Sequence, residues 1–153
     1  MTAAGGAAPV AAGLFTNPDA EGAIRLLGQR CRACGACFFP GGRMSCIRCF
    51  GTELETVELD GAGKVECLTV VRQAPKGYYG PLPYAIGSVV LGADVRVLAQ
   101  LVGRAPEAWR CGDAVAACVF ELPRARDGGD PALCYGFRPS ASAAERTAAE
   151  RSR

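Results

Sequence analysis

The stretch Cys31-Arg32-Ala33-Cys34-Gly35 is followed by a second stretch of the same kind, Cys46-Ile47-Arg48-Cys49-Phe50-Gly51. Each Cys-x-x-Cys pair holds two thiolates about one metal-ligand span apart, and two facing pairs make a tetrahedral cage of four sulfurs for Zn²⁺. Four protein ligands leave no open position for water or substrate, so the predicted ion is structural. A glycine after each pair suits a tight turn in which backbone approaches sulfur.

Other interpretations of these cysteines are two disulfides or four ordinary buried thiols. A single Cys-x-x-Cys is also a redox motif, but two in tandem without a thioredoxin-like strand and helix argue against redox chemistry. Cys37 is a further candidate ligand in place of Cys34. We prefer Cys34, because only that choice gives matched two-residue spacings and a following glycine. The predicted ligands are Cys31, Cys34, Cys46 and Cys49.

The composition fits one compact domain, or a small domain with an appendage, since the chain has 153 residues of which 50% are hydrophobic. An odd total of 9 cysteines with metal-type spacing favours a reducing, cytoplasmic compartment. We expect no secretory leader and no membrane-spanning run. The cysteines outside the predicted cage mostly lie in apolar runs and are expected to be small buried hydrophobic residues.

The net charge and the absence of histidine restrict the classes of function that this chain can have. With 17 basic and 15 acidic residues the net charge is +2, which is not the signature of a protein that neutralises many phosphates. A nucleic-acid-binding module remains an alternative, because zinc ribbons and OB-folds both bind nucleic acids and several arginines flank the cysteines. The chain has no histidine, which excludes catalysis by a histidine base.

Four segments are predicted along the chain. Residues 1–22 form a flexible arm or a short helix that begins near Asn17 and Pro18, residues 23–53 the zinc ribbon, 54–139 a barrel, and 140–153 a flexible tail. Short runs rich in β-branched residues, separated by turn signals, predict about five strands after residue 54. The fold class is therefore mainly β, with a five-stranded OB-type barrel as first choice and a small β-sandwich as the alternative.

Several motifs in fixed order resemble one family. They are Cys31-x-x-Cys34-Gly35, Phe39-Pro40, Cys46-x-x-Cys49, Gly61-x-Gly63, Pro83-Tyr84, Gly112-Asp113 and Phe137-Arg138-Pro139. This order is similar to that of the proteins with a rubredoxin-like zinc ribbon and an OB-fold that accompany thiolase-superfamily enzymes. The resemblance covers about residues 22–139. The chain departs from the family at Gly41-Gly42 and Ile47, where prolines are usual, and its N-terminal helical segment is shortened.

The resemblance implies a function for the chain. Members are small subunits beside thiolases, thiolase-like aldolases of steroid side chains and acyl-CoA hydratases, and one belongs to a benzoylsuccinyl-CoA thiolase. The implied function is a non-catalytic subunit that docks on a thiolase-superfamily protein as a hetero-oligomer and shares CoA or acyl-CoA with it. Degradation of an aromatic or steroid acyl-CoA is the implied setting. A hydratase partner is the alternative.

Aromatic and basic residues are the candidates for contact with CoA. Aromatic rings can cover the pantetheine arm or the adenine, and cations can meet the phosphates. The Tyr78-Tyr79 pair between chain breakers is the strongest candidate, because exposed aromatic residues in loops mark contact sites. Each ring has packing as its simpler role. The candidates are Phe38, Phe39, Arg72, Lys76, Tyr78, Tyr79 and Tyr84.

Overall fold

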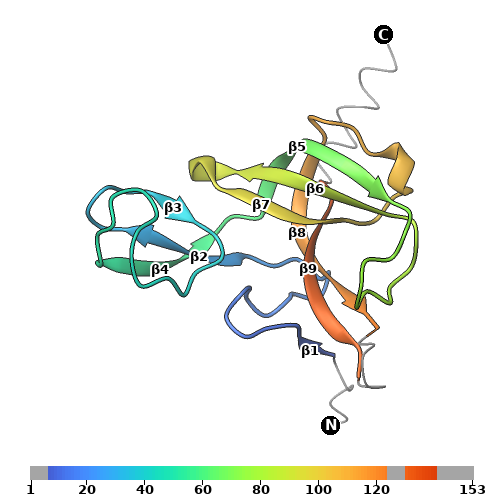
Figure 1. The fold of residues 1–153 in the computed structure, drawn as a ribbon, viewed down its shortest axis with the longest axis horizontal. Coiled ribbons are helices and arrows are strands. Elements are labelled where there is room, and N and C mark those ends of the chain that lie inside the picture. The colour runs from blue at the N-terminus through green and yellow to red at the C-terminus, as the bar shows by residue number, and fades with distance from the viewer. Residues whose placement is uncertain (1–6, 124–129, 141–153) are drawn as a thin grey trace.

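The computed structural model describes residues 7–123 and 130–140, which form two β-sheets (Figure 1). A three-stranded sheet lies at one end of the elongated molecule and a barrel occupies the other end. The prediction of a mainly β chain with a zinc ribbon before an OB-fold barrel is confirmed.

The small sheet carries the ribbon. It has the order β3-β2-β4, with β2 at Leu26–Cys31, β3 at Cys37–Phe38 and β4 at Leu54–Leu59. Strand β4 runs antiparallel to β2 over its full length, from Leu26↔Leu59 to Cys31↔Leu54. It therefore belongs to the ribbon sheet, although the sequence placed residues 54–59 in the barrel. The alternating pattern of this run indicates a strand but not its partner.

Five strands make the barrel. They are β5 at Ala62–Val71, β6 at Tyr84–Leu91, β7 at Arg96–Leu101, β8 at Ala114–Leu122 and β9 at Ala132–Pro139. Neighbours pair in the order β8-β5-β6-β7-β9, and a β9–β8 pairing closes the circle. The β7–β9 pair is parallel and the other pairs are antiparallel. This closed five-stranded arrangement is the OB-fold topology.

Alternating side chains fill the barrel interior. Every second residue of β6 is buried, as expected for a strand with one face on the core. Buried residues of the other strands and Trp109, which follows a 3₁₀ turn at Pro106–Ala108, complete the core. A Cβ on Gly136 would lie 2.9 Å from the Gln100 carbonyl oxygen, so this glycine permits close approach of β9 to β7. Gly92–Asp94, another 3₁₀ turn, joins β6 to β7.

The N-terminal segment lies against the barrel strand β9 and the ribbon strand β2. Strand β1 at Ala8–Pro9 pairs in parallel with β9, and the Leu27 amide donates to the Leu14 carbonyl at 2.9 Å. The expected short helix is a turn instead: the Asp19 carboxylate accepts hydrogen bonds from the amides of Glu21 and Ala23, both at 2.9 Å. Such a side-chain contact competes with a helix. The predicted tail beyond residue 140 lies outside the described residues.

Within the described residues, no helix has the length and apolar character needed to cross a bilayer.

Candidate metal centre and the barrel mouth

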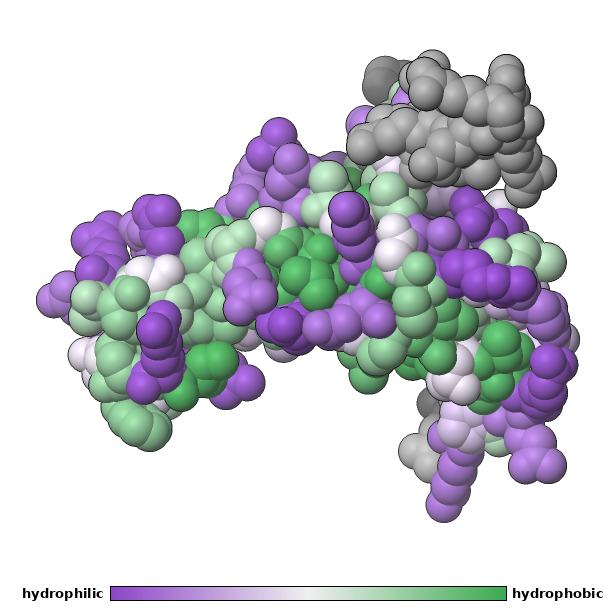
Figure 2. All heavy atoms as spheres, turned by 90° about the horizontal axis from the view of Figure 1, so that it is seen from above, coloured by the Kyte–Doolittle hydropathy of each residue, from purple (hydrophilic) through white to green (hydrophobic). Residues whose placement is uncertain are grey.

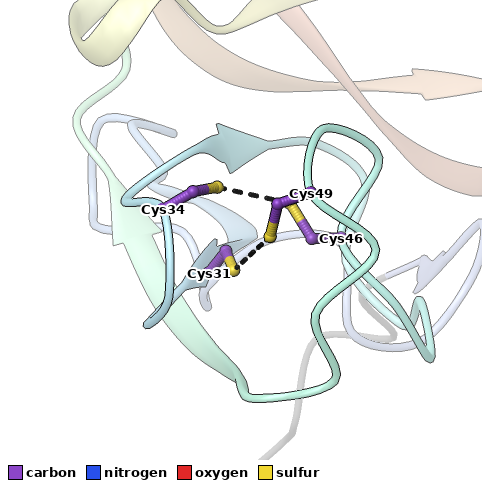
Figure 3. Close-up of side chains that lie close together, drawn as sticks. All are labelled: Cys31, Cys34, Cys46 and Cys49. Atoms are coloured by element: carbon purple, nitrogen blue, oxygen red, sulfur yellow. Dashed lines mark hydrogen bonds between the residues drawn. The ribbon is translucent and has the colours of Figure 1, made fainter.

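The four cysteines of the two pairs converge in the ribbon (Figure 3). Their sulfurs all lie within 4.8 Å of one another, and the Cys31–Cys49 and Cys34–Cys46 pairs are each 3.6 Å apart. Tetrahedral Zn²⁺ with bonds of about 2.3 Å places its sulfurs about 3.8 Å apart. These separations fit a zinc ion and exceed the roughly 2.05 Å of a disulfide bond. Cys31, Cys34, Cys46 and Cys49 would hold the ion.

Each Cys-x-x-Cys turn, here called a knuckle, has the same backbone bond. The Gly35 amide donates to the Cys31 carbonyl at 2.9 Å, and the Phe50 amide donates to the Cys46 carbonyl at 3.0 Å. In the second knuckle the Arg48 amide also points at the Cys46 sulfur, 3.3 Å away. Backbone amides of Cys49 and Arg48 lower the pKa of the Cys46 thiol to about 6. They favour the thiolate, which is the form that binds a metal.

Cys37 lies outside this cluster. Its sulfur is 3.9 Å from the Gly35 carbonyl oxygen, and its side chain packs against the barrel core. The choice between Cys34 and Cys37 thus follows from geometry, since only Cys34 brings its sulfur to the other three.

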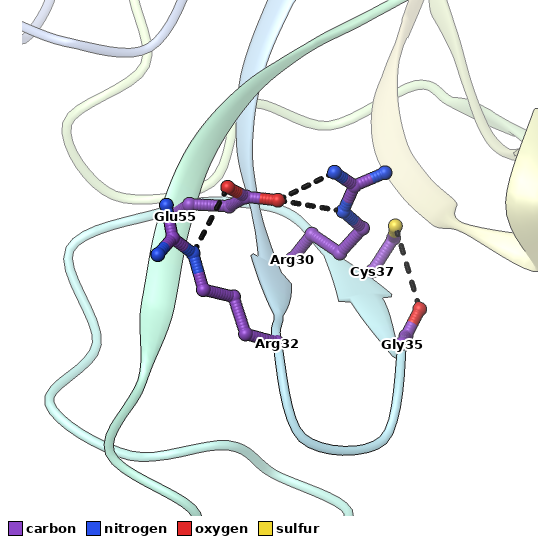
Figure 4. A network of polar contacts seen from close by, with 5 residues as sticks. All are labelled: Arg30, Arg32, Gly35, Cys37 and Glu55. Atoms are coloured by element: carbon purple, nitrogen blue, oxygen red, sulfur yellow. Dashed lines mark hydrogen bonds and ion pairs between the residues drawn. The ribbon is translucent and has the colours of Figure 1, made fainter.

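Charged residues brace the ribbon sheet beside the cysteines (Figure 4). Arg30 on β2 donates to Glu55 on β4 from Nε at 2.8 Å, and Arg32 donates to the same carboxylate at 3.2 Å. The hydrogen bond from Arg30, followed by that from Arg32, lowers the pKa of Glu55. Two cations on β2 or just beyond it thus share one carboxylate on β4.

The candidates for CoA contact fall into two separate groups. Phe38 is only 5% exposed and packs with Cys31 and Cys46, so its ring faces the ribbon interior. Phe39 contacts Tyr135 edge-on, with ring centroids 5.3 Å apart, and joins ribbon to barrel. For these two phenylalanines the structure shows the simpler packing role.

The loop of residues 72–83, between β5 and β6, lies at the end of the barrel far from the ribbon (Figure 1), and the other candidates belong to it or, for Tyr84, begin β6 directly after it. Tyr78 packs on Tyr84 with ring centroids 4.6 Å apart, and its hydroxyl donates to the Pro81 carbonyl at 2.9 Å. Tyr79 is 56% exposed. Arg72 pairs with Glu107 at 3.2 Å, and Lys76 is exposed on the same loop. The structure therefore brings the three tyrosines and two cations to one end.

We call this end of the barrel, with the loop of residues 72–83, the barrel mouth. A cavity of about 240 Å³ opens there. Tyr84 is one wall, and Gln100, Arg104, Phe120 and Leu122 are among the others. Burial raises the pKa of the neighbouring Tyr78 hydroxyl, which keeps it neutral. Sequence reasoning missed the last four residues, because they are far apart in the chain and converge only when β7 and β8 curve together.

Comparison with known proteins identifies the family. Residues 19–55 match the description "ChsH2, rubredoxin-like zinc ribbon domain" and residues 56–120 match "ChsH2, C-terminal OB-fold domain". A DUF35 domain-containing scaffold protein of Methanocaldococcus jannaschii is 36% identical over 114 residues, 74% of this chain and 79% of that protein. This chain belongs to the DUF35 family. The resemblance read from the ordered motifs is confirmed.

Two further proteins are similar to this chain along most of their length. The benzoylsuccinyl-CoA thiolase subunit BbsA of Thauera aromatica is 37% identical over 131 residues, 81% of this chain and 87% of that subunit. The solved structure titled "Ltp2-ChsH2(DUF35) aldolase" superposes with a TM-score of 0.58 at 30% identity, covering 75% of this chain and 84% of the matched chain. These relatives support a non-catalytic partner subunit of a thiolase-type complex.

Proposed function

We propose that this chain is the non-catalytic small subunit of a thiolase-type acyl-CoA complex that degrades an aromatic or steroid acyl-CoA. The observation that carries the proposal is the similarity to a benzoylsuccinyl-CoA thiolase subunit over 87% of that subunit's length. The nine cysteines form no disulfide in the part of the chain that the structure describes, and four of them make the zinc cage; both observations are consistent with a reducing, cytoplasmic location.

The side chains support a role without chemistry of its own. A thiolase needs a nucleophilic cysteine activated by a base, and this chain has no histidine. Burial raises the pKa values of the Cys118 and Cys134 thiols, which keeps both protonated and unreactive. The zinc ion, when bound, has four sulfur ligands and stabilises the fold of the ribbon. The reacting groups then belong to the partner.

The barrel mouth is the surface that we propose for CoA. The exposed Tyr79 ring and the Tyr78–Tyr84 pair offer flat apolar contacts for the pantetheine arm or the adenine. Lys76 and Arg72 offer cations to the phosphates, with Arg72 exchanging Glu107 for a phosphate oxygen. Phe38 and Phe39 support the ribbon and its contact with the barrel, so this proposal assigns them no contact with CoA.

The experiment is affinity purification of the tagged chain from its native host, followed by mass spectrometry and reconstitution. We expect a thiolase-superfamily chain to co-purify, the isolated chain to cleave no acyl thioester, and the reconstituted pair to do so. In that pair, a Lys76→Ala and Tyr79→Ser double variant should raise KM for the acyl-CoA about 3- to 10-fold with little change in kcat. Capture of a hydratase alone, or turnover by the isolated chain, would contradict the proposal.

A further inference from the structure

The two knuckles differ at one position that their shared geometry makes equivalent. In the first, Gly35 follows Cys34 with φ of +76°, and a Cβ built there would meet nothing within 4 Å. In the second, Phe50 follows Cys49 with φ of +61° and makes the same backbone hydrogen bond. This left-handed conformation suits glycine and is strained for a bulky residue. The second knuckle therefore carries a phenylalanine where glycine would be the easier residue.

The Phe50 side chain gains no burial in return. It is 78% exposed, and two other large apolar residues of the same loop are exposed as well, Met44 at 91% and Ile47 at 55%. We call Met44, Ile47 and Phe50 the knuckle patch. Figure 2 shows hydrophobic surface over the ribbon end of the molecule, interspersed with hydrophilic side chains. A strained, solvent-facing aromatic residue gains free energy only when another surface covers it.

Charge around the knuckle patch indicates what kind of surface covers it. Within residues 7–123 and 130–140, Arg48 forms no ion pair, and the Arg43 guanidinium lies over the Phe38 ring at 5.9 Å without a carboxylate partner. A second copy of the chain, meeting this patch through a two-fold axis, would bring these cations against each other. A different protein with an apolar pocket and an acidic rim matches the patch better.

We propose that Phe50 is the anchor by which this chain docks on its thiolase-superfamily subunit. Its ring enters an apolar pocket of that subunit, Met44 and Ile47 pack beside it, and Arg48 meets carboxylates at the pocket's rim. The inference rests on the proposed function, because the partner is the one named there. The metal-bound knuckle holds the anchor in place before binding, so little conformational entropy is lost on docking.

Phe50→Gly is the informative substitution, because it removes the aromatic ring and also relieves the strain of the left-handed backbone conformation at this position. We expect the variant to keep its zinc, measured by elemental analysis, and to melt at the same temperature or higher. Its Kd for the purified partner subunit, measured by isothermal titration calorimetry, should rise about 10-fold or more. Arg48→Glu should raise Kd as well and should change the salt dependence of binding.

Leu98→Ser is the matched control, since Leu98 is 66% exposed but lies on β7 of the barrel. It should leave Kd within about twofold. Unchanged affinity in Phe50→Gly, with tight binding by the wild type, would overturn this inference and leave the proposed function standing. Failure of the wild type to bind any thiolase-superfamily chain would instead count against the proposed function. Wild-type self-association, or sedimentation with anionic phospholipid vesicles, abolished in Phe50→Gly would also overturn the inference.

Discussion

The ribbon and the barrel are stabilised in different ways within one chain. The buried residues of the ribbon's own cluster are Cys31, Phe38 and Cys46, and two of these three are proposed metal ligands. The barrel buries a continuous apolar core that includes Val89, Phe137 and Trp109. The ribbon therefore depends on a metal ion and the barrel on apolar burial, because so small a cluster cannot offset the entropy of ordering the ribbon.

This difference explains why the ribbon can present an exposed anchor. A loop fixed by metal bonds does not need its apolar side chains for folding, so they remain available to a partner. The barrel uses every second residue of β6 for its core and leaves function to its loops and open end.

Removal of the metal should produce the largest effect. Cys46→Ser takes one thiolate from the cage, and structural zinc contributes on the order of 10 kcal/mol to the folding of small zinc domains. We expect loss of zinc by elemental analysis and fast hydrogen exchange across residues 31–51, while the amides of β5–β9 stay protected. Cys37→Ser is the control and should keep its zinc. If the barrel unfolded cooperatively with the ribbon in Cys46→Ser, the two parts would not be stabilised independently, and the prediction would be wrong.

Truncation of a side chain in the barrel core should destabilise the barrel and leave the metal centre intact. Trp109 is 2% exposed, and within the described residues its Nε1 donor has no hydrogen-bond partner. Trp109→Ala should cost about 3–5 kcal/mol in denaturant unfolding of the barrel, because it leaves a cavity. Zinc content under native conditions should not change. Trp109→Phe keeps most of the volume and removes the unpaired donor, so it should lower the free energy of unfolding by less than Trp109→Ala does. An equal loss in the two variants would indicate that the indole N–H has a hydrogen-bond partner.

The charged brace on the ribbon should have the smallest effect. Glu55→Gln removes the carboxylate shared by Arg30 and Arg32. We expect a small decrease in the temperature at which zinc is released, reported by a zinc-binding dye. The decrease should shrink between about 50 mM and 1 M salt, because salt screens exposed pairs. A difference that does not depend on salt would indicate that packing, rather than charge, is the role of Glu55.

Local patterns in the sequence were sufficient for much of the fold and of the metal centre. The paired two-residue spacings predict the four converging sulfurs, because a Cys-x-x-Cys turn fixes its own geometry within a few residues. The run Ala114–Leu122 predicts a strand with the bounds that β8 has, because β-branched and small apolar residues lie between clear turn signals. The closed five-stranded barrel followed from the number and spacing of such runs.

The tertiary structure alone decided the rest. It pairs β4 with β2, turns Phe38 inward and gathers the barrel mouth from distant strands. It also leaves the Phe50 side chain 78% exposed, although phenylalanine is usually buried. The physical reason is the range of the interactions. Turns and ligand spacings are set by neighbouring residues, whereas strand partners and the direction of side chains depend on contacts between segments far apart in the chain.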